Sequence, residues 1–413
     1  MAEIVLLERT GRTNVGIEGT YGTLAGTMVD VYPRTRGVIK LDEEQVKLAD
    51  ERPTKFAHQR NVRGAKRWSA KLDFDARPAS GVLNTAASPS TPPNMLLLKA
   101  LFGGESASAG STCAAGSTTT SINVQTGHGA RFAVGTMIAV EVSGTLYVRK
   151  VKAIATDALT LDLALPGSPS SGALVLNGYN YFPTQSNTQS VSLQHAAINA
   201  ANLSDYNQQW ECRGGTGNVT LSLEPGKTAV VGYELQGTVW AGPSTSPGLL
   251  PAPAASESQG TPWVLNNTTV LFQTTAASTT THTPIRKLDL KLSGGMIHLP
   301  EYGGIEGTTG VERVGDGYMF VDGEITKLYD PTFDAYYASE TDLMLRVVQQ
   351  YGTGLTARFL VVDLPTMFLS ARPVVDVDGG VRVHKFAFEC REDATISSPS
   401  TDAARSPVRI TVI

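Results

Sequence analysis

The stretch "EPGKT", residues 224–228, has the residue types that close a phosphate-binding loop. Such a loop wraps a phosphate with backbone N–H groups and needs another glycine five positions before its last one. That position is Leu221, inside a run that alternates apolar and polar residues, and Pro225 has no N–H to donate. Pro-Gly between two alternating runs is ordinary turn chemistry. The stretch therefore predicts the tip of a β-hairpin over 218–240 and not a nucleotide site.

Other residues that could do chemistry do not stand at the spacings of known sites. The histidines show no HExxH or paired spacing, and "DVDGG" at 376–380 has Ala387 where a calcium loop needs a glutamate. No GxSxG stretch and no cysteine in a recognisable nucleophile context occurs. Carboxylates two residues apart, such as Asp73 and Asp75, suit a solvated strand edge, although a glycosidase does not need its pair close in sequence. We expect no enzyme, no catalytic residue, no cofactor and no metal.

Composition favours a β-rich fold with many turns. The 413 residues include 41 glycines and 22 prolines, and only 17% are charged. The net charge of −4 argues against binding nucleic acid by bulk attraction. Cys113, Cys212 and Cys390 are too few and too far apart for a disulfide framework, which suggests a reducing compartment. Without a signal-like or membrane-spanning run, we expect a soluble protein made in the cytoplasm.

Periodicity and turn signals predict a first set of elements. Residues 68–77 alternate like a half-buried strand, and residues 92–104 have apolar positions at helical spacing between a proline and two glycines. Short strands separated by turn signals about 8–12 residues apart then predict a small β-barrel inserted into the first domain.

The second half repeats this order. Residues 319–330 correspond to the first strand and residues 338–352 to the helix, where Ser339 and Asp342 could form a capping box. Two long strands follow in both halves, which predicts a tandem duplication. The expected domains are a discontinuous first domain (1–112 and 182–241), the insert (113–181), a Pro- and Ser-rich linker (242–262) and a second domain (263–413).

Two oppositely charged runs precede the first strand. Within 41–51 and 55–67, the residues of interest are Asp42, Glu43, Glu44, Arg60, Arg63, Lys66 and Arg67. They could form a solvated pair of loops. They could bind nucleic acid, although stacking aromatic residues are missing. They could also meet their opposites on the next subunit in a head-to-tail contact.

Three stretches together resemble one family. They are "VGIEGTYGTL" (15–24), "WSAKLDFDARPASG" with the following "NMLLLKALFGG", and "CRGGTGNVTLSLEPGKTAVVGYELQGTVW" (212–240). In this order they resemble the major tail tube proteins of long-tailed, siphovirus-like bacteriophages. The insert is similar to small β modules of phage structural proteins.

The resemblance implies a mainly β fold of tandem tail-tube-type sandwich or barrel domains, each with a short flanking helix, plus the inserted barrel. Such domains form six-fold rings that stack into a hollow tail tube, in which hairpins of neighbours join into one barrel around the passing DNA. Two domains in one chain imply a ring of three chains, with a hexamer as the alternative. The implied partners are other copies of the chain, tail proteins such as the tape measure and terminator, and genomic DNA without specific binding. No membrane is implied, and the location is the virion tail.

The predicted hairpin suits a channel wall. Its polar face carries Thr220, Ser222, Glu224, Glu234 and Gln236, and its other face is apolar. A wide barrel needs an apolar outer face and a polar inner one. Because this polar face has Glu and no Lys or Arg, we expect it to line a lumen that repels phosphate. A different class stays open: a surface carbohydrate-binding or adhesin module, or a capsid decoration protein.

Overall fold

The structure is a computed structural model, and the chain folds as a mainly β protein, as its composition predicts. The described residues are 6–34, 39–46, 62–77, 95–184, 189–199, 206–244, 255–256, 262, 264–275, 284–293, 296–305, 308–313, 320–397 and 399–413. Within these ranges, no helix is long and apolar enough to cross a membrane.

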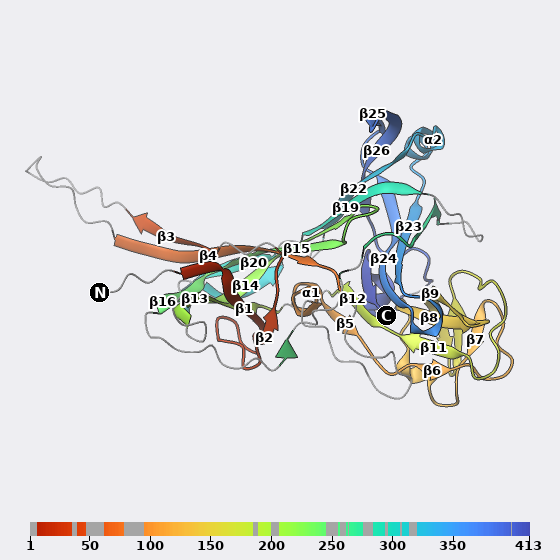
Figure 1. The fold of residues 1–413 in the computed structure, drawn as a ribbon, viewed down its shortest axis with the longest axis horizontal. Coiled ribbons are helices and arrows are strands. Elements are labelled where there is room, and N and C mark those ends of the chain that lie inside the picture. Colours follow the sequence, from red (N-terminus) through yellow and green to blue (C-terminus); the bar gives the residue numbers. More distant parts are fainter. Residues whose placement is uncertain are drawn as a thin grey trace, which may run out of the picture.

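One antiparallel sheet, here called the long sheet, runs through both halves of the chain (Figure 1). Its order is β3 (Lys40–Val46), β4 (Val62–Asp75), β15 (Val230–Gly237), β14 (Tyr206–Leu223), β19 (Ile285–Ser293), β22 (Phe320–Leu328), β26 (Val381–Cys390) and β25 (Val374–Asp378). Alternation turns one face of β4 toward the core, as Leu72 and Phe74 show with 1% exposure each, whereas every residue of the edge strand β25 is exposed. The predicted hairpin over 218–240 is therefore present as β14 and β15, and β14 joins the two halves by pairing with β19.

A second layer covers the apolar face of the long sheet. In the first half it consists of β17 (Ala255–Ser256), β2 (Val29–Val31), β1 (Leu6–Ile17), β13 (Val191–Asn199), the N-terminal part of β14, and β16 (Val239–Ser244). In the second half it consists of β18 (Thr268–Thr274), β23 (Leu343–Tyr351), β24 (Arg358–Leu369), β27 (Arg409–Val412), β12 (Tyr179–Pro183) and β5 (Gly103–Ser106). A single apolar core fills the space between the layers in both halves. The loop from β19 to β22 carries a separate hairpin of β20 (Met296–Ile305) and β21 (Thr308–Arg313).

The helices confirm one prediction and correct another. Helix α1 (Leu96–Phe102) lies inside the predicted range 92–104, and Gly103, with φ of 81°, ends it in the left-handed conformation. The helix predicted over 338–352 is wrong, because that range holds β23, while α2 (Thr332–Ala338) precedes it and α3 (Asp402–Arg405) lies near the C-terminus. Ser339 is the C-cap of α2, so no capping box forms with Asp342. Strand β23 is buried on both faces, and such a strand lacks the alternation that would have distinguished it from a helix.

Residues 111–177 form a six-stranded module with its own core, at the lower right of Figure 1. Its strands pair in the order β6 (Ser111–Thr112), β11 (Leu174–Asn177), β8 (Met137–Val142), β9 (Thr145–Ala155), β10 (Ala158–Leu161) and β7 (Ser121–Asn123). An isolated bridge between Cys113 and Val124 brings the two edges of this sheet together. The chain enters the module after β5 and leaves it before β12, and these two strands pair with each other. The module therefore interrupts the fold at one place without disturbing its strand order.

The motif "EGTYG" folds around one buried carboxylate. Glu18 is 6% exposed and accepts four hydrogen bonds, from the N–H groups of Gly22 and Gly214 and from the hydroxyls of Ser190 and Ser192, at 2.6–2.8 Å. These donors come from three separate parts of the chain, so the carboxylate ties the first loop to β13 and β14.

Replacing Glu18 by alanine is expected to lower the free energy of unfolding by about 3 kcal/mol, because several donors would remain buried without an acceptor. Urea denaturation followed by circular dichroism measures the change. The control is Glu324→Ala, since Glu324 is exposed on the long sheet. Equal midpoints for the two variants would contradict a structural role for the Glu18 carboxylate.

Candidate functional site

The face of the long sheet that points away from the core is the candidate functional surface, here called the polar face. Thr220, Ser222, Glu234 and Gln236 alternate with buried residues of β14 and β15 and lie on it. Glu224 follows in the turn after β14 and forms an ion pair with Lys227 at 2.7 Å. The structure thus brings the five residues selected from the sequence to one surface.

Neighbouring strands add charges that the hairpin alone did not predict. Lys71 Nζ lies 3.5 Å from Glu234 Oε1, and Lys291 stands opposite Thr220. The sequence pattern concerned the polar face of the hairpin alone, and the neighbouring strands add lysines to the same surface. Among the residues with described side chains, the carboxylates of the strands on this face are Asp73, Asp75, Glu234, Asp289, Asp322, Glu324, Asp376, Asp378 and Glu389, and the cations are Lys40, Arg67, Lys71, Lys287, Lys291 and Lys385. Acid remains in excess over base.

Two pairs of carboxylates stand directly opposite each other on this face. Asp289 pairs in register with Glu324, and Asp322 pairs with Glu389. Like charges at directly opposed positions destabilise a sheet. Lys287, 2.5 Å from Asp289, relieves part of this repulsion, and the hydrogen bond to Asp289 raises the pKa of Lys287. Lys291 stands opposite Asp322, so the acidic side chains of this face have cations interspersed among them.

The tip of the β14–β15 hairpin uses its N–H groups within the protein. The N–H of Gly226 donates to the carbonyl of Leu265 at 3.1 Å, and that of Lys227 donates to Glu224 O at 3.1 Å. Leu265 in turn donates to Lys227 O at 2.9 Å, so the segment after the predicted linker caps the tip. The N–H groups that a phosphate would need are occupied, which agrees with a structural turn.

The oppositely charged runs lie on the two strands of one hairpin. In the β3–β4 register Asp42 stands opposite Arg67, and Glu43 stands opposite Lys66. The two runs therefore lie at paired backbone positions within one chain. Arg63 lies on β4 opposite Gln45, Glu44 lies at a register shift in β3, and Arg60 lies outside the described residues. A contact of these residues with another subunit stays a prediction.

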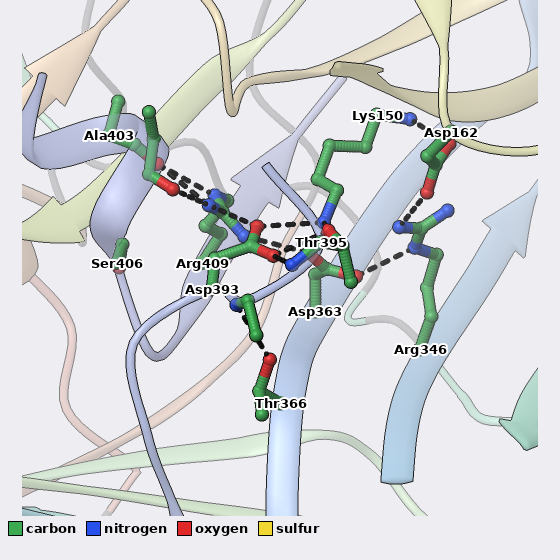
Figure 2. Close-up of polar contacts among 12 residues, drawn as sticks. Lys150, Asp162, Arg346, Asp363, Thr366, Asp393, Thr395, Ala403, Ser406 and Arg409 are labelled. Carbon is green, nitrogen blue, oxygen red and sulfur yellow. Dashed lines mark hydrogen bonds and ion pairs between the residues drawn. The ribbon is translucent and has the colours of Figure 1, made fainter. Parts of the chain in front are cut away.

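A network of buried ion pairs, which the sequence analysis missed, holds the six-stranded module to the second layer (Figure 2). Lys150 of β9 donates to Asp393 at 2.7 Å, and Arg346 of β23 bridges Asp162, at 2.6 Å, and Asp363, at 2.8 Å. Arg409 of β27 closes the network on Asp363 at 3.1 Å and on Asp393 at 2.8 Å. Three carboxylates balance three cations. The sequence signal for this network was a single charged residue inside an apolar run, as in "FLVVDLP" and "PVRITVI".

Apolar contacts accompany this network. Met137, Leu146 and Leu176 of the module pack against Phe359 and Val361 of β24. Phe359 and Val361 project from the face of β24 that is turned toward the module. Leu360 and Val362 project from the opposite face of this strand and belong to the main core. The order of layers is therefore polar face, main core, second layer and module.

The charges in the network shift the pKa of its carboxyls. Burial alone would raise the pKa of Asp363, but the neighbouring cations, Arg346 first among them, lower it to about 2. Burial would likewise raise the pKa of Asp393, and the charge of Arg409 lowers it below the usual value. Burial lowers the pKa of Lys150.

Acid is expected to loosen the attachment of the module. A carboxyl whose pKa is lower in the folded chain stabilises the fold above its unfolded pKa, about 3.9 for aspartate, and this stabilisation is lost as the pH falls through the folded value. For Asp363 the window runs from about pH 4 down to about pH 2. Hydrogen exchange of the β9 amides should accelerate there before that of the β14–β15 hairpin. Simultaneous loss of protection in both would contradict a local effect of the network.

A cleft of about 540 Å³ between β9 and the second layer offers little chemistry. Its cation, Arg149, donates from Nε and Nη2 to Ala164 O and from Nη1 to Val148 O. Its remaining lining is largely aliphatic and aromatic, with Tyr147 and Phe359 at its walls. Among the residues with described side chains, no group of three or more His, Cys, Asp or Glu is placed to hold a metal ion.

No protein-family model matches the chain, and a search of curated proteins gives no match.

Proposed function

We propose that this chain is a structural virion protein, the major tail tube protein of a long-tailed bacteriophage. Its copies assemble into rings that stack into a hollow tube, and DNA passes through the tube during ejection. The observation that carries this proposal is the long sheet, which has an apolar face on the core, an acidic polar face toward solvent and, among the described strands, an open edge at each end.

The repeated strand order supports a tandem of tube domains. The first half of the long sheet has the order β3, β4, β15, β14, and the second has β19, β22, β26, β25. In both halves a hairpin comes first, a short helix follows its second strand (α1 after β4, α2 after β22), and a later hairpin adds the other two strands. A sheet built from equal units can be continued by further copies of the same chain.

The two ends of the long sheet support self-association. In the part of the chain that the structure describes, β25 pairs with β26 alone and β3 pairs with β4 alone. Val374 and Val381 of the terminal hairpin are 61% and 43% exposed. Exposed apolar edge strands invite pairing with another chain, and closure into a barrel removes them.

The acidic excess of the polar face supports a channel for DNA. Carboxylates on the wall repel the phosphates of a passing duplex, whereas a basic wall would bind them. The lysines among them, such as Lys71 beside Glu234, are partly neutralised and moderate the repulsion. The proposal assigns Thr220, Ser222, Glu224, Glu234 and Gln236 to the wall of the lumen.

The position of the six-stranded module supports the same arrangement. Because the module lies beyond the second layer, it is on the far side of the molecule from the polar face. In a ring with the polar face inside, the module would project from the outer surface. Three chains per ring would display three modules, and the hexamer remains the alternative. Tail proteins at the two ends of the tube, such as the tape measure and terminator, are the further partners proposed.

Negative-stain microscopy of the purified chain over a range of concentrations tests the proposal. Rings or tubes with a central hole are expected. Dispersed monomers at all concentrations would overturn the proposal, and binding of such monomers to a glycan array would favour the adhesin instead.

A further inference from the structure

The edge strands of the long sheet differ from the β14–β19 junction at its middle in how far their apolar side chains are exposed. At the middle, Leu221 and Leu223 of β14 lie beside β19 and are 1% and 4% exposed. In the terminal strand β25, every residue is exposed, and Val375 and Val377 keep 50% and 63% of their surface in solvent. The strand repeat allows the two places to be compared residue by residue.

The register of the strands fixes which residues are equivalent. Val230 of β15 pairs with the last residue of β4, and Val383 of β26 pairs with the last residue of β22. On their other side these two residues pair with Ser222 and Asp376. Ser222 and Asp376 are therefore equivalent. One step along each strand, Leu221 is equivalent to Val375, and by the same shift Leu223 is equivalent to Val377.

The opposite end of the sheet follows the same rule. Ser69 of β4 and Asp322 of β22 lie equally far from the ends of their strands, and they pair with Lys40 and Lys291. The lysines are thus equivalent, and so are their preceding residues, Ile39 and Leu290. Ile39 is half-buried at the open edge of the sheet, whereas Leu290 is 2% exposed inside it.

Within one chain, Leu221 pairs with Leu290 across the junction of β14 and β19. We propose that the same junction recurs between chains: β25 of one copy pairs antiparallel with β3 of the next, with Val375 opposite Ile39 and Val374 opposite Lys40. This inference rests on the proposed self-assembly and adds its partner strands and their register.

The chemistry of both faces suits this register. On the core side, Val375 and Val377 would become buried as Leu221 and Leu223 are, which removes exposed apolar surface from solvent. On the polar face, the observed junction places the β-branched Thr220 opposite Lys291. The proposed junction places the β-branched Val374 opposite Lys40 in the same way. The contact joins unlike edges, so it is heterologous and closes into a ring when the rotation permits.

Cysteine pairs placed across the proposed junction test the register. Directly opposed residues of antiparallel strands lie about 4.5–5.5 Å apart at Cα, within reach of a disulfide. The first double variant is Ile39→Cys with Val375→Cys. The second is Lys40→Cys with Val374→Cys, whose two positions are exposed, so the substitutions leave the fold undisturbed. The matched control is Leu41→Cys with Val375→Cys, which shifts the pairing by two residues on the same face. Of the native cysteines, Cys113 and Cys212 are buried and Cys390 is half-buried, and burial raises the pKa of all three thiols, which disfavours their oxidation.

Mild oxidation followed by non-reducing electrophoresis is the readout, with negative-stain microscopy of the same samples. Both matched pairs are expected to give ladders of covalent multimers, about tenfold more abundant than in the shifted control because only opposed residues meet disulfide geometry. Two results would overturn the register and leave the proposed function standing. One is rings that form without crosslinks in the matched pairs, and the other is rings with more crosslinks in the shifted control than in the matched pairs. Monomers without rings in the unmodified chain would overturn both.

Discussion

Replacing Val377 by aspartate is expected to keep the purified chain monomeric at concentrations where the unmodified chain assembles. Val377 is 63% exposed in one copy, so the charge costs the isolated fold little. Its equivalent, Leu223, is 4% exposed beside β19, so assembly in the proposed register would bury the new carboxylate among apolar side chains. A loss of about 3 kcal/mol per contact raises the dissociation constant by more than ~100-fold. Sedimentation velocity over a concentration series measures the shift.

The control for this variant is Leu355→Asp. Leu355 is 43% exposed and lies beside β9, away from both open edges of the long sheet. It tests whether loss of any exposed apolar residue reduces association. Unchanged assembly is expected for Leu355→Asp, and circular dichroism should show folded protein for both variants. Rings formed by Val377→Asp at the usual concentration would rule out β25 as the contact strand.

Replacing Asp363 by alanine is expected to lower the free energy of unfolding by about 3–5 kcal/mol, because it leaves buried guanidinium groups without a counter-charge. Asp363 is fully buried and accepts from Arg346 at 2.8 Å and from Arg409 at 3.1 Å. Both arginines are also fully buried, so water cannot replace the lost carboxylate. The urea midpoint measures the loss, and Asp363→Asn should lose less because it keeps an acceptor of similar size.

An exposed ion pair provides the control for the Asp363 variants. Asp378 is paired with Arg286 at 2.9 Å, and its side chain is 57% exposed. Asp378→Asn should change the free energy of unfolding by less than about 1 kcal/mol, since exposed pairs contribute little. A loss for Asp363→Ala no larger than this would contradict the assigned role of the network in holding the module.

Local sequence patterns predicted the elements that have one buried face and one solvated face. Alternation in β4 and in the β14–β15 hairpin follows from one buried and one solvated face, and a missing glycine excluded the phosphate loop. The apolar spacing and the following glycines located α1. The polar side of the β14–β15 hairpin could therefore be selected from the sequence alone.

Other features depend on contacts between distant segments. Strand β23 is buried between the main core and the module, so its apolar residues stand on both faces and resemble a helical pattern. The ion-pair network joins residues as far apart as Lys150 and Asp393, and neither run of sequence shows its partner. The lysines beside the hairpin, Lys71 of β4 and Lys291 of β19, come from strands that become its neighbours only through sheet pairing. The proposed division into domains stays a prediction.

A cryo-electron microscopy reconstruction of the assembled chain tests the central claim most directly, because it locates the polar face relative to the ring axis. We predict a closed ring in which Thr220 and Glu234 face the central channel, β25 of each copy lies beside β3 of the next, and the six-stranded module projects outward. Glu224 and Glu234 on the outer surface, or an assembly without a central channel, would contradict the account.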